Sequence, residues 1–344
     1  HISYCSPVYE SGCGQQPAPS PPQDRHITAS IIIINWNTRE LLLNCLSSVF
    51  ATASGLDVEI MVVDNGSEDG SVGAVREQFP GVTIIQNNLN LGFARANNQA
   101  LARAAGRYLL LLNSDAALTE GSLQGLVAFM DKTPGAGIAA CRYIDIDGSR
   151  QNSFDSFPTL ATELFNKTIL KTLFPARYPS KRRDYREPLE VDSVIGACML
   201  VRAEAVRTVG VLDEDYFFFL EETDWCYRMR RAGWRVYHLP GIRVYHLQGK
   251  SKEKSPVNAW IEYYRSLYLF FKKNRGGFSY YVLRAGKALK LAVNLFLVSL
   301  GIGCTLGMNK GLTRRFRIYS GLLRWHLRGC PAGEGLAGKQ PASW

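Results

Sequence analysis

The sequence has few of the features that mark secreted or cysteine-built proteins. Its eight cysteines include no C-x-x-C motif and no paired spacing. Cys45, Cys141, Cys198 and Cys226 stand among apolar neighbours, so we expect buried, reduced thiols. Residues 1–27 lack the apolar core of a secretory signal. Both absences favour a cytoplasmic protein.

A long apolar run is also missing. The segment 291–303 (LAVNLFLVSLGIG) is only 13 residues long and is interrupted by Asn294, whereas a transmembrane helix needs roughly 20 apolar residues. Basic residues, among them Lys290 and Arg314, flank it on both sides. We therefore favour a helix on the membrane surface over a span, with packing of its apolar face on the main domain as the alternative.

Acidic residues are scarce near the C-terminus. Residues 250–330 contain 16 Lys and Arg against two Asp and Glu, in a chain whose net charge is +10. All the excess basic charge therefore belongs to this segment. This distribution indicates that the segment meets an anionic surface, such as the inner face of the cell membrane.

The remaining composition describes a folded chain of 344 residues, 46% of them hydrophobic, which is enough for one large domain with an appendage. Residues 1–27 are rich in Pro, Gly, Ser and Gln, so we expect a disordered tail. We expect the main domain at 28–255, basic helices at 256–330 that contact membrane or pack on the domain, and a flexible tail at 331–344.

Within the main domain, β-branched and leucine-rich runs alternate with helical patterns. Such alternation predicts an α/β fold, with βαβ units and a mostly parallel sheet flanked by helices. The runs are SIIIINW at 30–36, VEIMVVDNGS at 58–67, VTIIQNN at 82–88, YLLLLNSD at 108–115 and GIAACRY at 137–143.

Polar side chains recur where these strands end. Ligands of parallel sheets bind beyond the carboxyl ends of the strands, so the recurrence predicts a binding site at that edge. An acid in an N-x-D triplet at a strand end can present oxygen ligands to Mg²⁺ or Mn²⁺. The polar residues are Asn35, Asn37, Asp64, Asn88, Asn90, Asn113 and Asp115.

The order of the motifs carries a resemblance to a known family. IIINWN, VVDNGS, NLNLGFARANN, LLLLNSD, GACML, EETDWCYR and VYH follow one another between about residues 30 and 250. This series resembles the family 2 glycosyltransferases of the GT-A fold, and among them the bacterial rhamnosyltransferase-like and galactofuranosyltransferase-like enzymes of surface polysaccharide synthesis. NLGFARANN and EETDWCYR are the most specific pieces. The resemblance implies a Rossmann-like nucleotide-diphospho-sugar transferase.

The resemblance implies a donor site and a metal site. Asp115 matches the acid of the family's D-x-D motif, with Asn113 at its first position, and His246 matches a late metal-binding histidine. Mn²⁺ or Mg²⁺ would bind Asp115 and His246. Gly196, Ala197 and Asp224 would belong to the acceptor or sugar pocket. The donor residues it implies are Asn35, Asn37, Asp64, Asn90, Gly92, Asn97, Asn113 and Asp115.

The acidic cluster in FFFLEETDWCYR separates when 221–231 is placed on a helix. Glu221 and Asp224 fall on a polar face, with Arg228 at the favourable i,i+4 spacing from Asp224. Glu222 falls on the face of Trp225, where burial would raise its pKa and make it a better base. In the family the second acid of this motif is the base, so we expect Glu222 in that role, with Glu221 as the rival.

These residues together predict an inverting, metal-dependent transfer of a rhamnose-like, galactofuranosyl or GlcNAc unit from a nucleotide sugar. The acceptor would be a lipid-linked or polysaccharide glycan at the cytoplasmic face of the membrane. The processive Q-x-x-R-W motif is missing. The alternatives are a nucleotidyltransferase, although no Gly-rich phosphate loop follows the first strand, and a non-enzymatic basic protein that binds nucleic acid or membrane. No nucleic-acid partner is expected.

Overall fold

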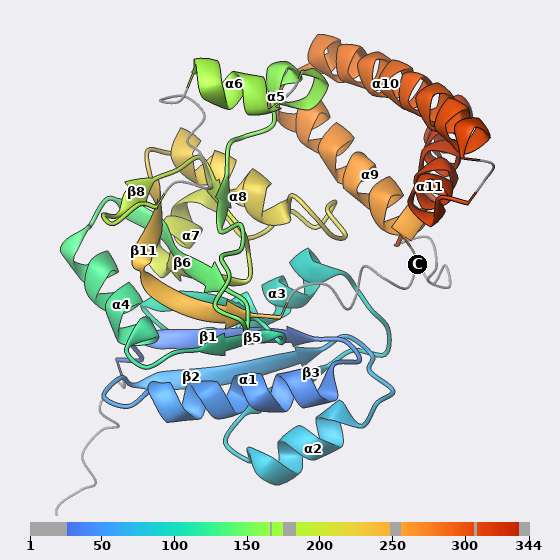
Figure 1. Cartoon of the computed structure of the whole chain (residues 1–344). Coiled ribbons are helices and arrows are strands. Elements are labelled where there is room, and N and C mark those ends of the chain that lie inside the picture. The colour runs from blue at the N-terminus through green and yellow to red at the C-terminus, as the bar shows by residue number, and fades with distance from the viewer. Residues whose placement is uncertain (1–25, 166, 175–183, 248–255, 306–307, 337–344) are drawn as a thin grey trace, which may run out of the picture.

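The computed structural model describes residues 26–165, 167–174, 184–247, 256–305 and 308–336. Most of the expected N-terminal tail and residues 337–344 of the expected C-terminal tail lie outside these ranges. The described chain forms a central sheet with helices on both faces, and three long helices that lie together beyond one end of it (Figure 1).

The central sheet has nine strands in the order β3-β2-β1-β4-β10-β6-β11-β5, with β8 paired to β11; β7 and β9 form a separate pair. The strands are β1 Ala29–Asn35, β2 Val58–Asp64, β3 Thr83–Gln86, β4 Tyr108–Asn113, β5 Ala116–Leu118, β6 Ala136–Ile144, β7 Phe154–Asp155, β8 Leu189–Glu190, β9 Ser193–Val194, β10 Cys198–Arg202 and β11 Arg235–His246.

Most of the long strands point the same way. β1, β2, β3 and β4 are parallel, and so are β6 and β11, while β10 runs antiparallel between β4 and β6. The carboxyl ends of β1, β2 and β4 therefore meet at one edge, where the start of β10 also lies. The expected mostly parallel α/β sheet is confirmed.

Helices cover both faces because side chains of a strand alternate between them. Ile31 and Ile33 of β1 belong to a core shared with α1, α2 and α4, whereas Ile32 belongs to a core shared with α3, α7, α8 and α9. The helices are α1 Arg39–Thr52, α2 Ser71–Gln78, α3 Phe93–Leu101, α4 Ser122–Lys132, α5 Leu160–Leu164, α6 Lys167–Leu173, α7 Ala203–Val209, α8 Glu221–Arg231, α9 Pro256–Asn274, α10 Gly277–Cys304 and α11 Lys310–Leu327.

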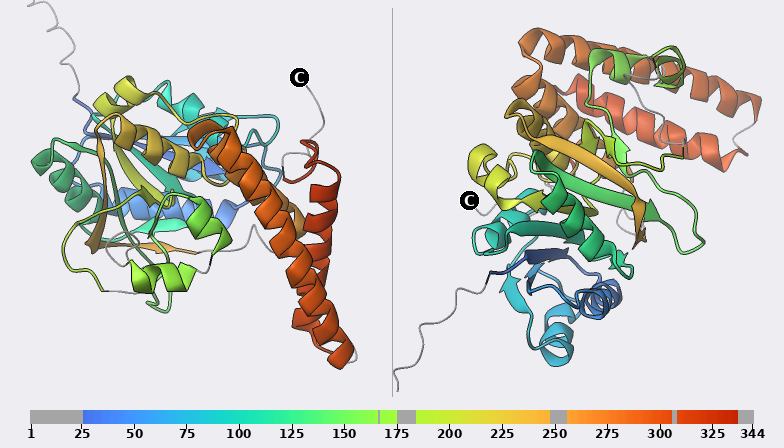
Figure 2. Two further views of the ribbon diagram at one scale, coloured as in Figure 1. Left: turned by 90° about the horizontal axis from the view of Figure 1, so that it is seen from above. Right: turned by 90° about the vertical axis from the view of Figure 1, so that its left-hand side faces the viewer.

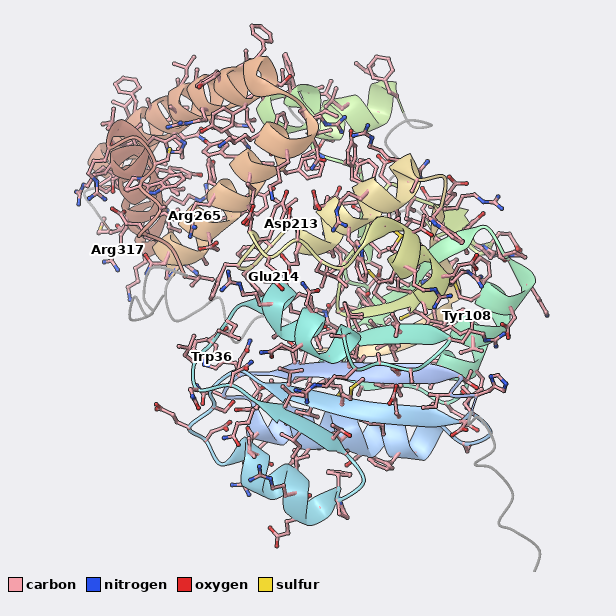
Figure 3. The ribbon with its side chains drawn as sticks, turned by 180° about the vertical axis from the view of Figure 1, so that it is seen from behind. Trp36, Tyr108, Asp213, Glu214, Arg265 and Arg317 are labelled. Atoms are coloured by element: carbon pink, nitrogen blue, oxygen red, sulfur yellow. The ribbon has the colours of Figure 1, made fainter. Side chains whose placement is uncertain are left out.

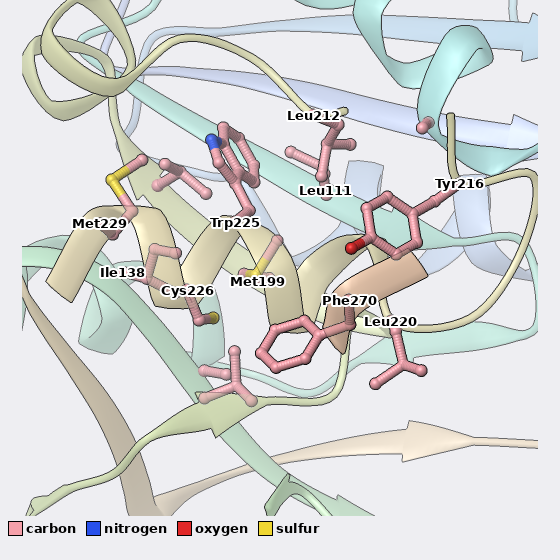
Figure 4. Packing of buried hydrophobic residues seen from close by; sticks show 14 of the residues in the cluster. Leu111, Ile138, Met199, Leu212, Tyr216, Leu220, Trp225, Cys226, Met229 and Phe270 are labelled. Atoms are coloured by element: carbon pink, nitrogen blue, oxygen red, sulfur yellow. The ribbon is translucent and has the colours of Figure 1, made fainter. Parts of the chain in front are cut away.

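Helix α9 is part of the core of the main domain. Phe270 is fully buried in the core cluster that also contains Trp225 and Cys226 of α8 and Met199 of the sheet (Figure 4). Ser266 donates a hydrogen bond to the carbonyl of Phe218 at 2.9 Å. The first of the basic C-terminal helices is thus fixed to the segment that leads into α8.

Helices α10 and α11 pack on each other and on α9, and project beyond the sheet (Figure 2). The apolar run lies within the 28-residue α10, which is long and apolar enough to cross a membrane by length and composition alone. The uninterrupted apolar run of 291–303 is shorter than α10 because Lys287 and Lys290 precede it within the helix. Only 17% of the most apolar window is buried in the protein, so α10 is not a core helix.

Two details differ from the sequence pattern. The pentapeptide RVYHL occurs at 235–239 and again at 243–247, and both copies belong to β11 except Leu247, which follows it; the register shifts between Leu239 and Arg243. Residues 145–190, which show no periodicity in sequence, contain α5 and α6; α5 packs on α10, and α6 on α5 (Figure 1). Periodicity missed α5 and α6 because both are short.

Candidate active site

The polar strand ends gather at one edge of the sheet. Asn35 pairs with Asp64 in the ladder between β1 and β2, and Ile34 pairs with Asn113 in the ladder between β1 and β4. Trp36, just beyond β1, marks this edge in Figure 3, whereas Tyr108 marks the opposite one. Helices α9 and α11 lie toward the Trp36 end.

A buried hydrogen-bond network holds the first two strand ends together. The Asn35 amide donates to Asp64 Oδ1 at 2.9 Å and to Ser67 Oγ at 3.0 Å, and Asp64 Oδ2 accepts from the Ser67 amide at 2.9 Å. Thr38 donates to Asn35 Oδ1 at 2.7 Å. Asn35 and Asp64 therefore shape the loop at 65–69, and their side chains are almost fully buried.

Asn37 is the exposed member of this group. Its φ of +53° is in the left-handed region, where Asn is among the few tolerated residues. Its backbone N–H donates to Ser67 Oγ and its side-chain oxygen accepts from the Glu68 N–H, both at 2.9 Å. Asn37 thus joins the loop after β1 to the loop after β2 on the open side of the sheet.

The NLGFARANN segment forms the next wall. Asn90 Oδ1 accepts from the Gly92 N–H at 2.9 Å, and Gly92 has a φ of +85°, which favours glycine. A Cβ on Gly92 would lie 2.5 Å from the Phe217 carbonyl. The predicted donor wall therefore contacts the chain leading to α8. Asn97 is fully buried, and its amide nitrogen donates to the Phe93 carbonyl while its oxygen has no protein partner.

Beyond β4, the structure brings the two predicted metal ligands together. His246 Nε2 lies 3.5 Å from Asp115 Oδ1. His246 Nδ1 contacts Gln151 Oε1 at 3.0 Å, and Gln151 Nε2 donates to the His246 carbonyl at 2.6 Å. When Nδ1 carries the proton toward Gln151, Nε2 presents its lone pair on the Asp115 side, which is how metal-binding histidines are commonly oriented.

These two residues fit a divalent ion shared with a substrate. Among the described residues, no group of three or more His, Cys, Asp and Glu could hold a metal ion, so the protein offers one carboxylate and one imidazole. Mg²⁺ and Mn²⁺ sites often take the rest of their ligands from substrate phosphates. Asn113, by contrast, is held in the sheet: its N–H donates to the Ala197 carbonyl at 2.9 Å.

Gly196 and Ala197 lie at the same edge because β10 runs antiparallel to β4 and begins there. The Tyr143 hydroxyl donates to the Ile195 carbonyl at 2.6 Å and accepts from the Cys198 N–H at 3.1 Å, which fixes the turn. A Cβ on Gly196 would lie 3.5 Å from the Cβ of Glu222 and 4.0 Å from the Phe93 ring. Glu222 thus packs beside Gly196 at the edge where β4 ends.

An unusual turn immediately precedes helix α8, whose first turn contains the acidic residues. Phe219 and Leu220 have φ values of +71° and +65°, a region that is costly for bulky residues. Two consecutive left-handed residues reverse the chain after Phe218 and start α8 at Glu221. The strain is offset by burial of Leu220 in the core and by the Ser266 hydrogen bond to this turn.

The two glutamates have different surroundings. Burial raises the pKa of Glu222 to about 7, and Asp155 adds to the shift. Burial, then Glu222 and Glu262 of α9, raise the pKa of Glu221 well above its usual value. Glu222 thus lies on the side of Gly196 and Asp155, and Glu221 on the side of α9. The predicted rise in the pKa of Glu222 through burial is confirmed.

The expected polar face of α8 is not solvated. Glu221 and Asp224 are 5% and 2% exposed, because α9 covers them. The predicted i,i+4 pair is present, with Arg228 Nε 2.8 Å from Asp224 Oδ2, and Asn274 of α9 donates to Asp224 Oδ1 at 2.8 Å. Asp224 therefore anchors α8 to α9, and its contact with the acceptor or sugar stays a prediction.

Sequence reasoning missed three residues of this region. Gln151 orients His246, Ser67 joins the loops after β1 and β2, and Asp155 lies near Glu222. Gln151 and Asp155 come from the stretch without periodicity, so no sequence signal distinguishes them. Ser67 directly follows VVDNG and could have been found as part of that strand-end motif.

Comparisons with known sequences find rhamnosyltransferases among the relatives of the chain. The chain is 28% identical over 263 residues to the N-acetylglucosaminyl-diphospho-decaprenol L-rhamnosyltransferase of Mycobacterium tuberculosis, covering 72% of this chain and 85% of that protein. It is 24% identical over 255 residues to the rhamnosyltransferase WbbL of Escherichia coli, covering 71% and 93%.

Solved structures share the fold. The mannosyltransferase PcManGT of Pyrobaculum calidifontis, in complex with GDP-Man and Mn²⁺, matches with a TM-score of 0.55 and 18% identity over 90% of this chain and 88% of that one. GalNAc-T7 with UDP, GalNAc and Mn²⁺ matches with a TM-score of 0.52 and 18% identity over 73% and 49%.

The family model described as glycosyl transferase family 2 matches residues 30–210, which is more than half of the chain. This match decides against the nucleotidyltransferase and the non-enzymatic alternatives. The chain belongs to glycosyl transferase family 2 and is a glycosyltransferase of the GT-A fold, related to bacterial rhamnosyltransferases.

Proposed function

We propose that the chain transfers a deoxyhexose such as rhamnose, with inversion, from a nucleoside-diphosphate sugar to a hydroxyl of a lipid-linked glycan. The carrying observation is the position of Glu222: its Cβ lies 3.5 Å from where a Cβ on Gly196 would stand, and its charge acts on Tyr263 of α9. A base at this position faces the donor from one side and can receive an acceptor from the other.

In this proposal Glu222 removes the proton from the acceptor hydroxyl as that oxygen attacks the anomeric carbon. A pKa of about 7 suits a base that works near neutral pH. Glu222 Oε2 is buried and has no hydrogen-bond partner among the described residues, so it can accept a hydrogen bond from substrate; the same holds for Glu221 Oε2. Glu221 is less suited, because it lies toward Glu262 and away from the sheet edge.

The loops after β1, β2 and β3 would hold the donor. Asn37 and the backbone of loop 65–69 are placed to meet the nucleotide, while Asn35 and Asp64 hold that loop in position. Asn90, Gly92 and Asn97 form the wall toward the sugar. Asp115 and His246 would hold Mn²⁺ or Mg²⁺, and the imidazole favours Mn²⁺. The bound ion would neutralise charge on the departing diphosphate.

The acceptor class rests on the relatives and on α10. One relative is named for N-acetylglucosaminyl-diphospho-decaprenol, a lipid-linked sugar. The outward face of α10 is mostly apolar, with Lys290 and Ser299 as exposed polar residues, which is the reverse of a solvated surface helix. Seven residues on this face are between 49% and 82% exposed: Phe278, Tyr281, Leu289, Val293, Phe296, Leu297 and Leu300.

Charge supports a membrane as the surface that covers this face. No Asp or Glu occurs between Glu262 and Glu334, and Arg314, Arg315 and Arg317 of α11 are exposed beside α10. Apolar side chains flanked by cations bind anionic bilayers, with ~1 kcal/mol contributed per basic residue near the surface. We therefore propose peripheral binding at the cytoplasmic face of the membrane.

A transfer assay tests the activity. The purified chain is incubated with Mn²⁺, dTDP-rhamnose or another nucleotide sugar, and a GlcNAc-diphosphoryl prenol, and the products are identified by mass spectrometry. Transfer from dTDP-rhamnose that stops on addition of EDTA is the expected result. Transfer from none of the dTDP, UDP and GDP sugars to this acceptor overturns the proposal.

Flotation with vesicles tests the membrane contact. Truncation before α9 would expose Phe270 and the core, so substitution on α10 is the sharper change. Phe296→Ser with Leu300→Ser is expected to lower binding to anionic vesicles at least about tenfold, because two exposed apolar side chains are removed. Phe50→Ser, at an exposed site on α1, is the control. Equal flotation of the three proteins contradicts the membrane proposal.

A further inference from the structure

A row of aromatic rings leads from the turn before α8 to the N-terminal part of α9, at the margin of the core. Phe218 and Phe219 contact each other at 4.5 Å between ring centroids, Phe219 contacts Tyr263 at 6.0 Å, and Tyr263 contacts Trp260 at 5.9 Å. All three contacts are edge-to-face. The buried aromatic residues that fix α9 to the core, such as Phe270 and Phe271, lie elsewhere on the helix.

The row of aromatic rings begins in the strained turn before α8 and ends at an exposed position of α9. Phe219 has a left-handed backbone and immediately precedes Leu220 and α8, whereas Trp260 is 46% exposed. Tyr and Trp rings that are apolar on their faces and wet at one edge are frequent at binding surfaces. The rings thus form a path from the surface of α9 to the start of α8.

Polar groups stand beside this path. Burial raises the pKa of the Tyr263 hydroxyl, and the carboxylates of Glu163, Asp155 and Glu222 raise it further. Tyr263 of α9 is therefore near Glu222. Asp155 lies near both Glu222 and Tyr263, since β7 pairs with β9 just before that turn.

The positions of the proposed donor residues limit which substrate can bind beside the aromatic rings. Donor loops and metal ligands lie at the ends of β1, β2 and β4, and Gly196 lies between them and Glu222. A base accepts the proton of the attacking hydroxyl, so the acceptor must contact Glu222 from the remaining side. Aromatic faces with a nearby carboxylate match a sugar ring, which has apolar C–H faces and hydroxyl edges.

We propose that Phe219, Tyr263 and Trp260, together with Asp155, form the subsite for the acceptor sugar, a pyranose that stacks on the aromatic rings and donates a hydroxyl hydrogen bond to Asp155. The inference rests on the proposed function, because it assigns the acceptor side of the same centre. It makes α9 a determinant of acceptor specificity, in addition to its role in the core.

Trp260→Ala tests this subsite, since the residue is exposed and the variant should fold. The probe is GlcNAc diphosphate carrying a short alkyl chain, which avoids any membrane contribution. The KM for this acceptor is expected to rise at least about tenfold, while the KM for the donor and the slow hydrolysis of donor by water stay unchanged. Trp260→Phe should restore most of the acceptor affinity. Phe50→Ala, which removes an exposed ring of α1, is the matched control.

Asp155→Asn gives a second, independent readout. It should raise the acceptor KM and also shift the acid limb of the pH profile of transfer to lower pH, because Asp155 raises the pKa of Glu222. An unchanged acceptor KM in both Trp260→Ala and Asp155→Asn overturns the subsite. Absence of donor binding and donor hydrolysis in the wild-type protein would instead overturn the proposed function, so the two failures are distinguishable.

Discussion

His246 Nε2 lies 3.5 Å from Asp115 Oδ1, and the Gln151 side chain holds the far side of the same imidazole. The last strand of the sheet thereby brings an imidazole to the carboxylate that follows β4. The hydrogen bond from Nδ1 to Gln151 decides which nitrogen faces Asp115. The fit of this pair to a divalent ion therefore depends on a residue outside the family motifs.

Removal of Gln151 should weaken metal binding without removing a ligand. Gln151→Ala is expected to lower Mn²⁺ affinity about 10–100-fold, the usual effect of losing the residue that orients a histidine ligand. Electron paramagnetic resonance of free Mn²⁺ measures the affinity directly. Ser149→Ala, in the same loop, is the control, and equal affinity of the two variants contradicts the assigned role of Gln151.

Gly92 should tolerate no side chain. Gly92→Ala places a Cβ 2.5 Å from the Phe217 carbonyl, in addition to the strain of a φ of +85°. Gly210 has nearly the same backbone, with φ +87° and ψ 177°, and nothing within 4 Å, so Gly210→Ala measures the strain alone, about 1–3 kcal/mol. Urea unfolding should give a larger loss for Gly92→Ala. Equal losses would show that the Phe217 contact relaxes.

The buried ion pair between α10 and α5 should couple the C-terminal helices to the domain. Lys287 Nζ lies 2.8 Å from Glu163 Oε2, and both side chains are at most 10% exposed. Lys287→Met should lower the free energy of unfolding by about 3–5 kcal/mol, because Glu163 keeps a buried charge. Lys290→Met, at an exposed site on the same helix, should change little. A Lys287→Met effect no larger than that of Lys290→Met would contradict this coupling.

The pKa of Glu222 also predicts a pH dependence of stability. Its folded-state pKa of about 7 is above the ordinary value of 4.5, so its favourable contribution is complete below about pH 4.5 and is lost as pH rises through 7. Glu222→Gln cannot ionise, so relative to wild type it should gain about 1–3 kcal/mol between pH 5 and pH 8. Thermal melts of both proteins check this, with Glu68→Gln as an exposed control. A difference in melting temperature that is the same at pH 5 and pH 8 would contradict a buried, ionising Glu222.

The sheet and its polar edge could be predicted because their signals are local. Continuous apolar runs gave the buried strands, and the parallel direction of β1, β2 and β4 brought Asn35, Asp64 and Asn113 to one edge. Asp115 and His246 also met, because the position of a strand end follows from the fold.

The surroundings of α8 could not be predicted in full, since they depend on tertiary contacts. Helical phase separated Glu222 from Glu221 but placed Asp224 on a polar face, which α9 in fact buries. Nothing in the local pattern shows that a helix from beyond residue 255 returns to cover this face. Gln151 and Asp155 were missed for the same reason, because only the folded chain brings irregular segments beside the site.

The most direct test of the account compares Glu222→Gln with Glu221→Gln. Each variant is assayed for transfer to the lipid-linked acceptor and, by calorimetry, for binding of the nucleotide sugar with Mn²⁺. Glu222→Gln should lower kcat at least ~100-fold, the contribution of a positioned base, while the donor Kd stays within about twofold. Near wild-type turnover by Glu222→Gln, or a complete loss confined to Glu221→Gln, would contradict the assignment of Glu222 as the base.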